Sequence, residues 1–336
     1  MPTAIPVPTL LLNLSLVPLS DAQAAECDRA QDVSWLFRDL SLLLPSHTVL
    51  RRDEPLSRRT TLRVGGPAEI YVEPPSETAL ATVLEMCALR GIPRMILGRG
   101  SNLLVRDGGI RGVVISLAAP VFGNIEVLPG DRIKAGAGAP LKVLANAARQ
   151  AGLTGLEFLE GIPGSLGGAL RMNAGAMGHW TFDVVHTLRC MDRSGTIREL
   201  PGAEAGAQYR GCPLLRTHIA LGAVLSGTPA DRAVIEERMT SSNTKRWTSQ
   251  PRQPSAGCTF KNPSPELPAG KLIDELGLKG TRVGAAMVSD VHANFFVNLG
   301  GATATDVLQL IELIQTRVRE ARGIELATEV EIVGED

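Results

Sequence analysis

Apolar residues along this chain alternate between two periodicities, and the alternation begins near Arg51. Runs rich in β-branched and aromatic residues predict strands, and three of them stand close together: 69–72, 94–97 and 112–117. The segment between the first two repeats its apolar residues every three or four positions, which predicts a helix between Ser76 and Gly91. Strands that alternate with helices predict a mixed lobe of α/β or α+β type.

A second lobe of the same kind is expected from about residue 120. The hydrophobic pattern predicts strands at 131–135, 184–190 and 219–225. A helix is predicted over 141–151, with Pro140 in its first turn, where no backbone N–H is needed.

A third segment begins near Pro229, and its clearest element is a helix over 306–322. Thr303 and Asp306 have the spacing of a capping box, and Gly323 ends the pattern. Five apolar residues share one face and predict ordinary core packing: Val307, Leu310, Ile311, Ile314 and Val318. The expected division is an extension over 1–45, a two-lobed domain (46–118 and 119–228) and a C-terminal domain over 229–336.

The first 45 residues form the expected extension, with one short helix near 33–44. An apolar run over 5–19 is followed by Ala22-Gln23-Ala24, which resembles a signal-peptide cleavage site. No Lys or Arg precedes Arg29, and three prolines interrupt the run. A poorly ordered extension is therefore the preferred interpretation, and a signal peptide is the alternative. The run is too short to span a membrane.

Charge and cysteine content narrow the class of protein. The 336 residues carry 34 Lys and Arg against 35 Asp and Glu, which argues against a nucleic-acid or membrane surface. The five cysteines form no CxxC pair, and the five histidines lack metal-ligand spacing, so we expect neither a disulfide framework nor a metal. A reducing cytoplasm is the expected setting.

Four glycine-rich loops are candidates for chemistry. Gly98 to Asn102 follows a predicted strand and suits either an anion-binding nest or a tight connection. It matches neither a GxGxxG fingerprint nor a Walker A motif. Residues 161–169 hold four glycines, and 173–178 follow at once. So many glycines favour close approach of the backbone to a flat or phosphorylated ligand, as in one wall of a cofactor site.

The fourth loop, 255–263, contains Cys258 among small residues and is followed by Lys261 and Asn262. A thiol presented to a substrate is one interpretation, and a cationic neighbour would then favour the thiolate. A buried cysteine in a turn is the other. The residues of this loop do not decide between them.

In order and spacing, the motifs resemble the UDP-N-acetylenolpyruvoylglucosamine reductase family from about residue 49 to 334. The segments that carry the resemblance are 59–68, 97–105, 161–178, 209–212, 257–263, 270–280, 289–298 and 326–330.

The resemblance implies an α+β fold, with a two-lobed FAD-binding domain of the vanillyl-alcohol-oxidase type and a C-terminal α/β substrate-binding domain. It also implies an NADPH- and FAD-dependent oxidoreductase of peptidoglycan precursor synthesis. The enolpyruvyl group of UDP-N-acetylglucosamine enolpyruvate would be reduced to give UDP-N-acetylmuramate. No nucleic acid, membrane or protein partner is expected.

The resemblance also implies site residues. Arg210 and Glu329 would stabilise an enolate-like intermediate, with Glu329 protonated, and Cys258 would donate the proton. Substrate contacts would come from Tyr209, Lys261, Asn262 and His292. The residues expected to contact FAD are Arg99, Gly100, Ser101, Asn102, Leu103, Gly161, Ile162, Pro163, Gly164, Ser165, Gly168, Ala169, Asn173, Gly175 and Ala176.

Two departures from the family pattern stand out. Most members have Ser at the position of Cys258. A thiol, with an unperturbed pKa near 8.5, is a reasonable donor, and its liability is oxidation where such a thiol is exposed and has a low pKa. Cys212 also replaces a Ser, as a structural swap. No Tyr follows Tyr209, which places the chain in the branch without a tyrosine-bearing loop. The diphosphate would then be held by one or more of Lys245, Arg246 and Arg252.

Two other functions are compatible with parts of this pattern. Another flavoenzyme of the same fold, such as an oxidase of small alcohols, would lack the motifs at 257–263 and 326–330. A non-enzymatic sugar-nucleotide-binding protein would not need Arg210, Cys258 and Glu329 together.

Overall fold

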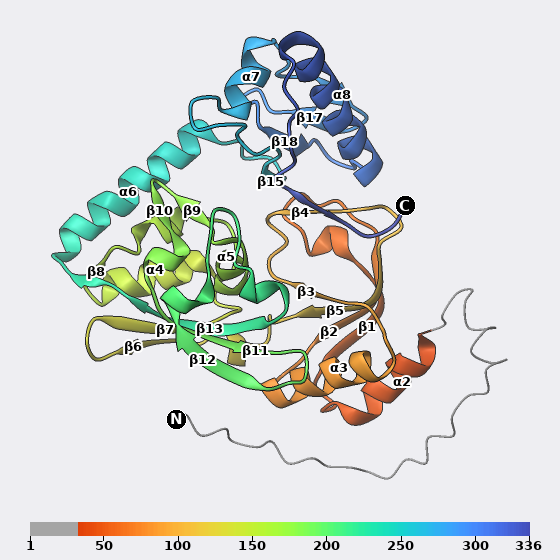
Figure 1. The fold of residues 1–336 in the computed structure, drawn as a ribbon, viewed down its shortest axis with the longest axis vertical. Helices are drawn as coiled ribbons and strands as arrows, with labels where there is room; N and C mark the ends of the chain where they lie inside the picture. The colour runs from red at the N-terminus through yellow and green to blue at the C-terminus, as the bar shows by residue number, and fades with distance from the viewer. Residues whose placement is uncertain (1–32) are drawn as a thin grey trace.

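The computed structural model describes residues 33–336, in which three sheets of four or five strands surround a common centre, with three two-stranded sheets beside them (Figure 1). The apolar run at 5–19 and its two interpretations lie outside the described residues. The described chain opens on helix α2 (Ser34–Leu43), which packs on α3 (Glu77–Leu89) through the fully buried Leu36 and Leu40. No helix from Ser34 onward is both long and apolar enough to cross a bilayer.

The first lobe is built on a mixed four-stranded sheet. Its strands, in spatial order, are β1 (Val49–Pro55), β2 (Pro67–Glu73), β5 (Ile110–Ser116) and β3 (Arg94–Leu97). β1 is antiparallel to β2, and the other pairs are parallel. The crossover between β2 and β3 is α3, whose N-cap Ser76 accepts a hydrogen bond from the Ala79 N–H at 3.1 Å. The predicted strands and helix of this lobe are confirmed.

The second lobe is a five-stranded antiparallel sheet with helices α4 (Leu141–Gln150) and α5 (Leu166–Met172). Its strands, in spatial order, are β12 (Ile197–Pro201), β11 (Val185–Met191), β13 (Ile219–Ser226), β7 (Arg132–Gly136) and β6 (Ile125–Leu128). Pro140 lies one position outside α4, as its N-cap, because its ψ of 132° is extended. The prediction that placed it in the first turn was wrong by one residue.

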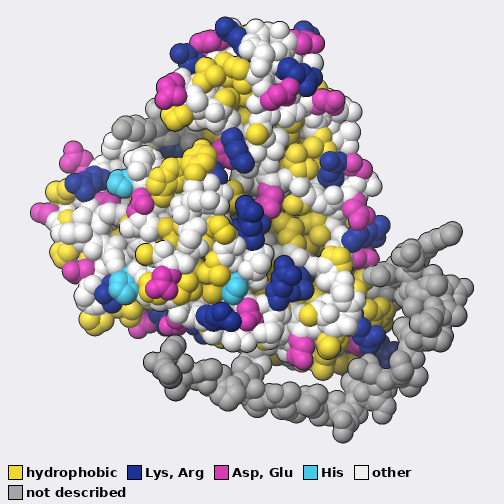
Figure 2. All heavy atoms as spheres, in the orientation of Figure 1, with side chains coloured by type: hydrophobic (Ala, Val, Ile, Leu, Met, Phe, Trp, Pro, Cys, Tyr) yellow, Lys and Arg dark blue, Asp and Glu magenta, His cyan; other side chains and the backbone are white. Residues whose placement is uncertain are grey.

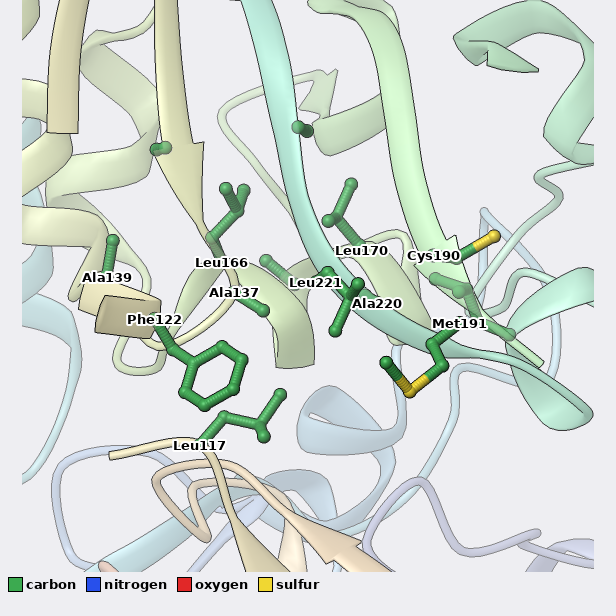
Figure 3. Close-up of a cluster of buried hydrophobic side chains, with 14 of the residues drawn as sticks. Leu117, Phe122, Ala137, Ala139, Leu166, Leu170, Cys190, Met191, Ala220 and Leu221 are labelled. Carbon is green, nitrogen blue, oxygen red and sulfur yellow. The ribbon is translucent and has the colours of Figure 1, made fainter. Parts of the chain in front are cut away.

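Helix α5 is fixed by apolar packing at the junction of the two lobes (Figure 3). Leu166 and Leu170 are fully buried there, in the cluster that also contains Phe122 and Leu117; Leu170 lies beside Ala220 and Leu221. A helix with its inner face buried in this way has little freedom to shift, because moving it would open cavities in a close-packed core. The glycine-rich loop before α5 therefore has a defined position.

The C-terminal part is reached through α6 (Arg232–Ser249), which runs along one side of the molecule (Figure 1). The hydrophobic pattern did not predict α6, because it carries few apolar residues; Ile235 and Met239 are buried. Beyond it lie an antiparallel sheet and two helices. These elements are β15 (Ser255–Cys258), β18 (Phe295–Asn298), β17 (Ala286–Val288), β16 (Arg282–Val283), α7 (Ala269–Glu275) and α8 (Ala304–Arg322).

Helix α8 confirms the prediction made from its apolar stripe. Thr303 and Asp306 form the capping box, and Gly323 adopts a left-handed conformation with φ 67° at the C-cap. All five residues of the predicted stripe are buried.

The chain ends by returning to the first lobe. Strand β19 (Glu331–Val333) pairs in parallel with β4 (Leu103–Val105). Just before it, the Asn102 amide donates to the carbonyl of Glu329 at 3.1 Å. This return brings Glu329 next to the loop that follows β3. Two short pairs complete the fold: β8 (Leu153–Thr154) with β14 (Thr228–Pro229), and β9 (Gly175–Ala176) with β10 (His179–Trp180).

Candidate active site

A cavity of about 1600 Å³ lies where the two lobes meet the C-terminal part. Its walls come from the loops around 98–103, 161–169 and 250–258. Pockets for a single small ligand hold roughly 300–1000 Å³. The cavity therefore has room for an extended dinucleotide together with a second molecule.

The lining is strongly basic, although the chain as a whole has a net charge of −1. Figure 2 shows basic side chains along the middle of this face. The acidic residues of the lining are Asp192, Glu329 and Glu331. The basic residues are Arg58, Arg59, Arg63, Arg94, Arg99, Arg171, Arg193, Arg210, Arg216, Arg246 and Arg252, with His218 beside them. A cleft so charged concentrates anionic ligands.

The loop after β3 has the features of an anion-binding nest. Gly100 has φ +60°, and a Cβ there would lie 2.5 Å from the carbonyl oxygen of Arg59. Glycine is therefore required at this position. Within residues 33–336, the backbone N–H groups of Arg99 to Asn102 donate to no protein acceptor. Successive free N–H groups at the wall of a basic cavity fit the phosphate oxygens of a dinucleotide.

A second glycine-rich loop faces the first. The Cβ position of Gly98 lies 3.1 Å from Oγ of Ser165, and that of Gly164 lies 3.4 Å from Oγ of Ser101. Nothing in the described chain lies within 4 Å of the Cβ position of Gly161, which opens toward the cavity. The two loops thus form adjoining walls of the cavity, and the residues present fit a bound FAD.

Of the fifteen residues predicted to contact FAD, fourteen line the cavity. The exception is Asn173. Its side-chain oxygen accepts from the Phe182 N–H at 3.1 Å, and its amide donates to the carbonyl of Gln208 at 3.2 Å. Asn173 thus supports the turn that carries Arg210.

The three residues predicted to be catalytic come together in this cavity from distant parts of the chain. Cys258 ends β15, Glu329 precedes β19, and Arg210 lies in a turn of the second lobe. Nη2 of Arg210 lies 2.8 Å from Oε1 of Glu329. The Glu329 N–H donates to the carbonyl of Thr259, next to Cys258, at 2.8 Å.

Cys258 is half-buried and lines the cavity, so neither of the two interpretations of its loop holds fully. Burial raises its pKa to about 12, and the nearby Glu329 adds to this rise while Arg210 opposes it. Lys261, whose charge was expected to favour the thiolate, is exposed. An uncompensated thiolate is costly where water is scarce, so burial dominates.

The pKa of the Glu329 carboxyl is also raised. Burial raises the pKa of its carboxyl, although Arg210 and Lys261 each lower it. Burial outweighs these two cations, so Glu329 is easier to protonate than an exposed glutamate.

The four residues predicted to contact substrate lie outside the cavity lining. Asn262 accepts from the Ala269 N–H at 3.1 Å, at the start of α7. The His292 ring packs on Phe295 with centroids 5.0 Å apart, and Tyr209 is 59% exposed. Lys261 is exposed as well. Their contact with substrate stays a prediction.

Arg246, one of the residues predicted to hold the diphosphate, lines the cavity and has a second role that was not predicted. Its Nη1 donates to the carbonyl of Gly161, and burial lowers the pKa of its guanidinium. It therefore holds the second glycine-rich loop. Trp247 and Gln250 line the cavity nearby. None of these positions was signalled by periodicity, since α6 has no apolar stripe.

Cys212 is buried, with Sγ 3.4 Å from the carbonyl oxygen of Ala205. It lies outside the cavity lining, in keeping with a structural role.

Two family models match the chain. One is described as an FAD binding domain and matches residues 68–201. The other is the C-terminal domain of UDP-N-acetylenolpyruvoylglucosamine reductase and matches residues 250–333. Together with the cavity, they define an FAD-binding oxidoreductase of α+β fold, as expected.

Curated relatives and a solved structure agree with these matches. The UDP-N-acetylenolpyruvoylglucosamine reductases of Rubrobacter xylanophilus and Heliobacterium modesticaldum are each 46% identical over 286 residues. The alignment covers 84% of this chain in both cases, and 95% and 90% of the relatives. The crystal structure of the Thermus caldophilus enzyme superposes with a TM-score of 0.74 at 38% identity, covering 85% of this chain and 98% of that one. The chain belongs to the UDP-N-acetylenolpyruvoylglucosamine reductase family.

Proposed function

We propose that this chain reduces the enolpyruvyl group of UDP-N-acetylglucosamine enolpyruvate to give UDP-N-acetylmuramate, with FAD as cofactor and NADPH as hydride donor. The observation that supports it most directly is the meeting of Arg210, Cys258 and Glu329 beside the glycine-rich walls of one basic cavity. Residues 46–228 would bind FAD in two lobes, and 229–336 would complete the substrate site.

FAD would be held by the two facing loops, 98–103 and 161–169, through backbone N–H groups and small side chains. When bound, FAD supplies hydride transfer from NADPH to the substrate. The arginines of the cavity would bind the phosphate groups of all three ligands. A single face that receives NADPH and then the sugar nucleotide predicts ping-pong kinetics.

Hydride addition to the terminal enolpyruvyl carbon places negative charge on the neighbouring carbon and its carboxylate. Arg210 would stabilise that charge with its positive guanidinium. A protonated Glu329, which the raised pKa of this carboxyl favours, would donate a hydrogen bond to the same group.

Cys258 would protonate the carbon. A neutral thiol is the form that can give a proton, and the raised pKa keeps Cys258 neutral across the physiological range. An enolate carbon is a far stronger base than a thiolate, so the transfer is favourable. The buried thiolate that remains would readily recover a proton from solvent.

The proposal places the reaction in the cytoplasm, where NADPH and nucleotide-activated sugars are formed. Its partners are these small molecules alone.

Purified protein reconstituted with FAD tests the proposal. We expect visible flavin bands, their bleaching by NADPH, and their return when the enolpyruvyl sugar nucleotide is added. A protein that binds the sugar nucleotide without oxidising NADPH would be a binding module, and the proposal would be wrong. UDP-N-acetylglucosamine without the enolpyruvyl group is the matched control and should not restore the bands.

A further inference from the structure

Arg210 is held by aromatic rings as well as by a carboxylate. Its Cζ atom lies 5.7 Å from the ring centroid of Trp180 and 5.6 Å from that of Tyr209. The two rings meet edge to face, with centroids 5.5 Å apart and planes at 78°. Both lie within the ~6 Å over which a ring attracts a cation.

These rings hold the cation without using its N–H donors. One donor of Arg210 is directed at Glu329, and Nε is buried with no acceptor among residues 33–336. Arg59, in the same cavity, differs because Glu54 and Glu73 both accept hydrogen bonds from it. The buried Nε cannot reach a ligand, so the donors that Arg210 keeps for a ligand carboxylate are those of its Nη groups, whereas Arg59 is largely satisfied by the protein.

The backbone at Arg210 is fixed. Its φ of 57° is left-handed, a conformation that costs a non-glycine residue free energy and persists only where neighbours enforce it. Gln208 and Gly211 exchange backbone hydrogen bonds of 2.8 and 3.1 Å around it. What remains to be positioned is the long side chain, and the rings limit its movement.

Trp180 is itself held rigidly. Its backbone N–H donates to the Asp183 carboxylate at 2.7 Å, and the Thr181 hydroxyl donates to the carbonyl of Ala174 at 2.7 Å. A Cβ at Gly175 would lie 2.4 Å from Cε3 of Trp180. Glycine at 175 thus allows the indole to lie across the facing strand, and the ring has a defined place.

We infer that Trp180 is a positioning residue for the reduction step: its ring holds the Arg210 guanidinium beside Glu329 with donors left for the substrate carboxylate. This role rests on the proposed function and lies outside the cofactor and substrate contacts assigned above. It acts through Arg210, so its loss should slow the sugar-nucleotide step and spare the NADPH step.

Trp180→Leu and Trp180→Phe test this in the full-length, FAD-reconstituted protein. Stopped-flow absorbance would follow flavin reduction by NADPH and reoxidation by the enolpyruvyl sugar nucleotide separately. We expect Trp180→Leu to slow reoxidation by roughly fivefold to thirtyfold, the effect of one cation–π contact. Trp180→Phe, which keeps a ring face, should stay within about threefold of wild type. Trp180→Met serves the same purpose if the Leu variant does not fold.

Two controls separate positioning from general damage. Trp35 and Arg90 form a similar pair, 4.9 Å from guanidinium to ring, outside the cavity lining, so Trp35→Leu should leave both rates unchanged. In an Arg210→Gln background, Trp180→Leu should have no further effect on reoxidation.

The inference is overturned if Trp180→Phe slows reoxidation as much as Trp180→Leu does. It is also overturned if either variant slows flavin reduction by NADPH, or if Trp180→Leu still slows reoxidation in the Arg210→Gln background. A Leu variant with the wild-type rate would overturn it as well. If the wild-type protein itself is not reoxidised by the sugar nucleotide, the proposed function fails and the inference fails with it.

Discussion

Nη2 of Arg210 and Oε1 of Glu329 lie 2.8 Å apart, joining a turn of the second lobe to the segment that precedes the final strand. The two residues belong to different parts of the fold, so the contact exists only when both parts are assembled. The candidate active site is therefore a product of the assembled molecule.

Replacing Cys258 tests its role as proton donor. Cys258→Ser keeps a protonated group and should retain at least about a tenth of the activity. Cys258→Ala should lower the rate of sugar-nucleotide reduction by roughly 10²–10⁴-fold, the usual contribution of a general acid. Flavin reduction by NADPH should be unchanged in both, measured by stopped-flow absorbance. Wild-type turnover by the Ala variant would rule out the assignment.

The protonated state of Cys258 can be measured by alkylation. Because its pKa is about 12, the thiolate is scarce at pH 8 and iodoacetamide should react roughly a thousandfold more slowly than with an ordinary cysteine. The rate should keep rising with pH beyond 10. Peptide mapping by mass spectrometry gives the rate, and the same site in urea-unfolded protein is the control. Rapid alkylation of the native site at pH 8 would contradict the raised pKa of Cys258.

Gly100→Ala should destabilise the protein and weaken FAD binding more than Gly91→Ala does. Both glycines have left-handed φ, +60° and +63°, so both variants bear the same backbone strain. Only at Gly100 would the new Cβ meet backbone, 2.8 Å from Cα of Thr60, whereas Gly91 has open space. We expect a loss of about 1 kcal/mol at Gly91 and about 2–4 kcal/mol at Gly100. Urea denaturation measures the free energy of unfolding, and FAD titration measures the affinity for FAD. Equal losses in the two variants would contradict the view that Gly100 is needed because the backbone of Arg59 and Thr60 lies so close to it.

Asp107 of the first lobe caps helix α8 of the C-terminal part. Its carboxylate accepts from the Ala304 N–H at 2.8 Å and from the Thr305 N–H at 2.9 Å. Asp107→Ala should lower the free energy of unfolding by about 1–3 kcal/mol, measured by urea denaturation. Asp231→Ala, which removes the N-cap of α6, is the matched control and should cost about 1 kcal/mol.

The Asp107 effect should depend on pH. Burial alone would raise the pKa of this carboxyl, but the hydrogen bonds from Ala304 and Thr305 outweigh it and lower the pKa. A lowered pKa means that the stabilisation is complete above the unfolded value near 4 and is lost as pH falls through the folded value. Wild type and Asp107→Ala should therefore converge in stability in acid. A constant difference down to pH 2 would contradict this account.

Several elements of the fold can be predicted from the local pattern of apolar and capping residues. Helix α8 was predicted with its capping box and buried stripe, and α3 with its N-cap Ser76, because capping and periodicity depend on residues within a few turns. Helix α6 was not predicted, because most of its residues are polar. Its position depends on the parts of the fold that it connects. The glycine-rich loops were recognisable because glycine is required where backbones approach closely.

The sequence by itself determined six strands of the first two lobes, four helices (α2, α3, α4 and α8), the glycine-rich loops and the candidates Arg210, Cys258 and Glu329. Only the tertiary structure decided the protonation of Cys258: its neighbour Lys261 is exposed, while burial and Glu329, distant in sequence, raise its pKa. The tertiary structure also decided the contact of Trp180 with Arg210. No motif indicated Trp180, and its ring reaches Arg210 only after β10 has folded back on β9. Electrostatic and ring contacts depend on distances in space, and these are set when remote segments pack together.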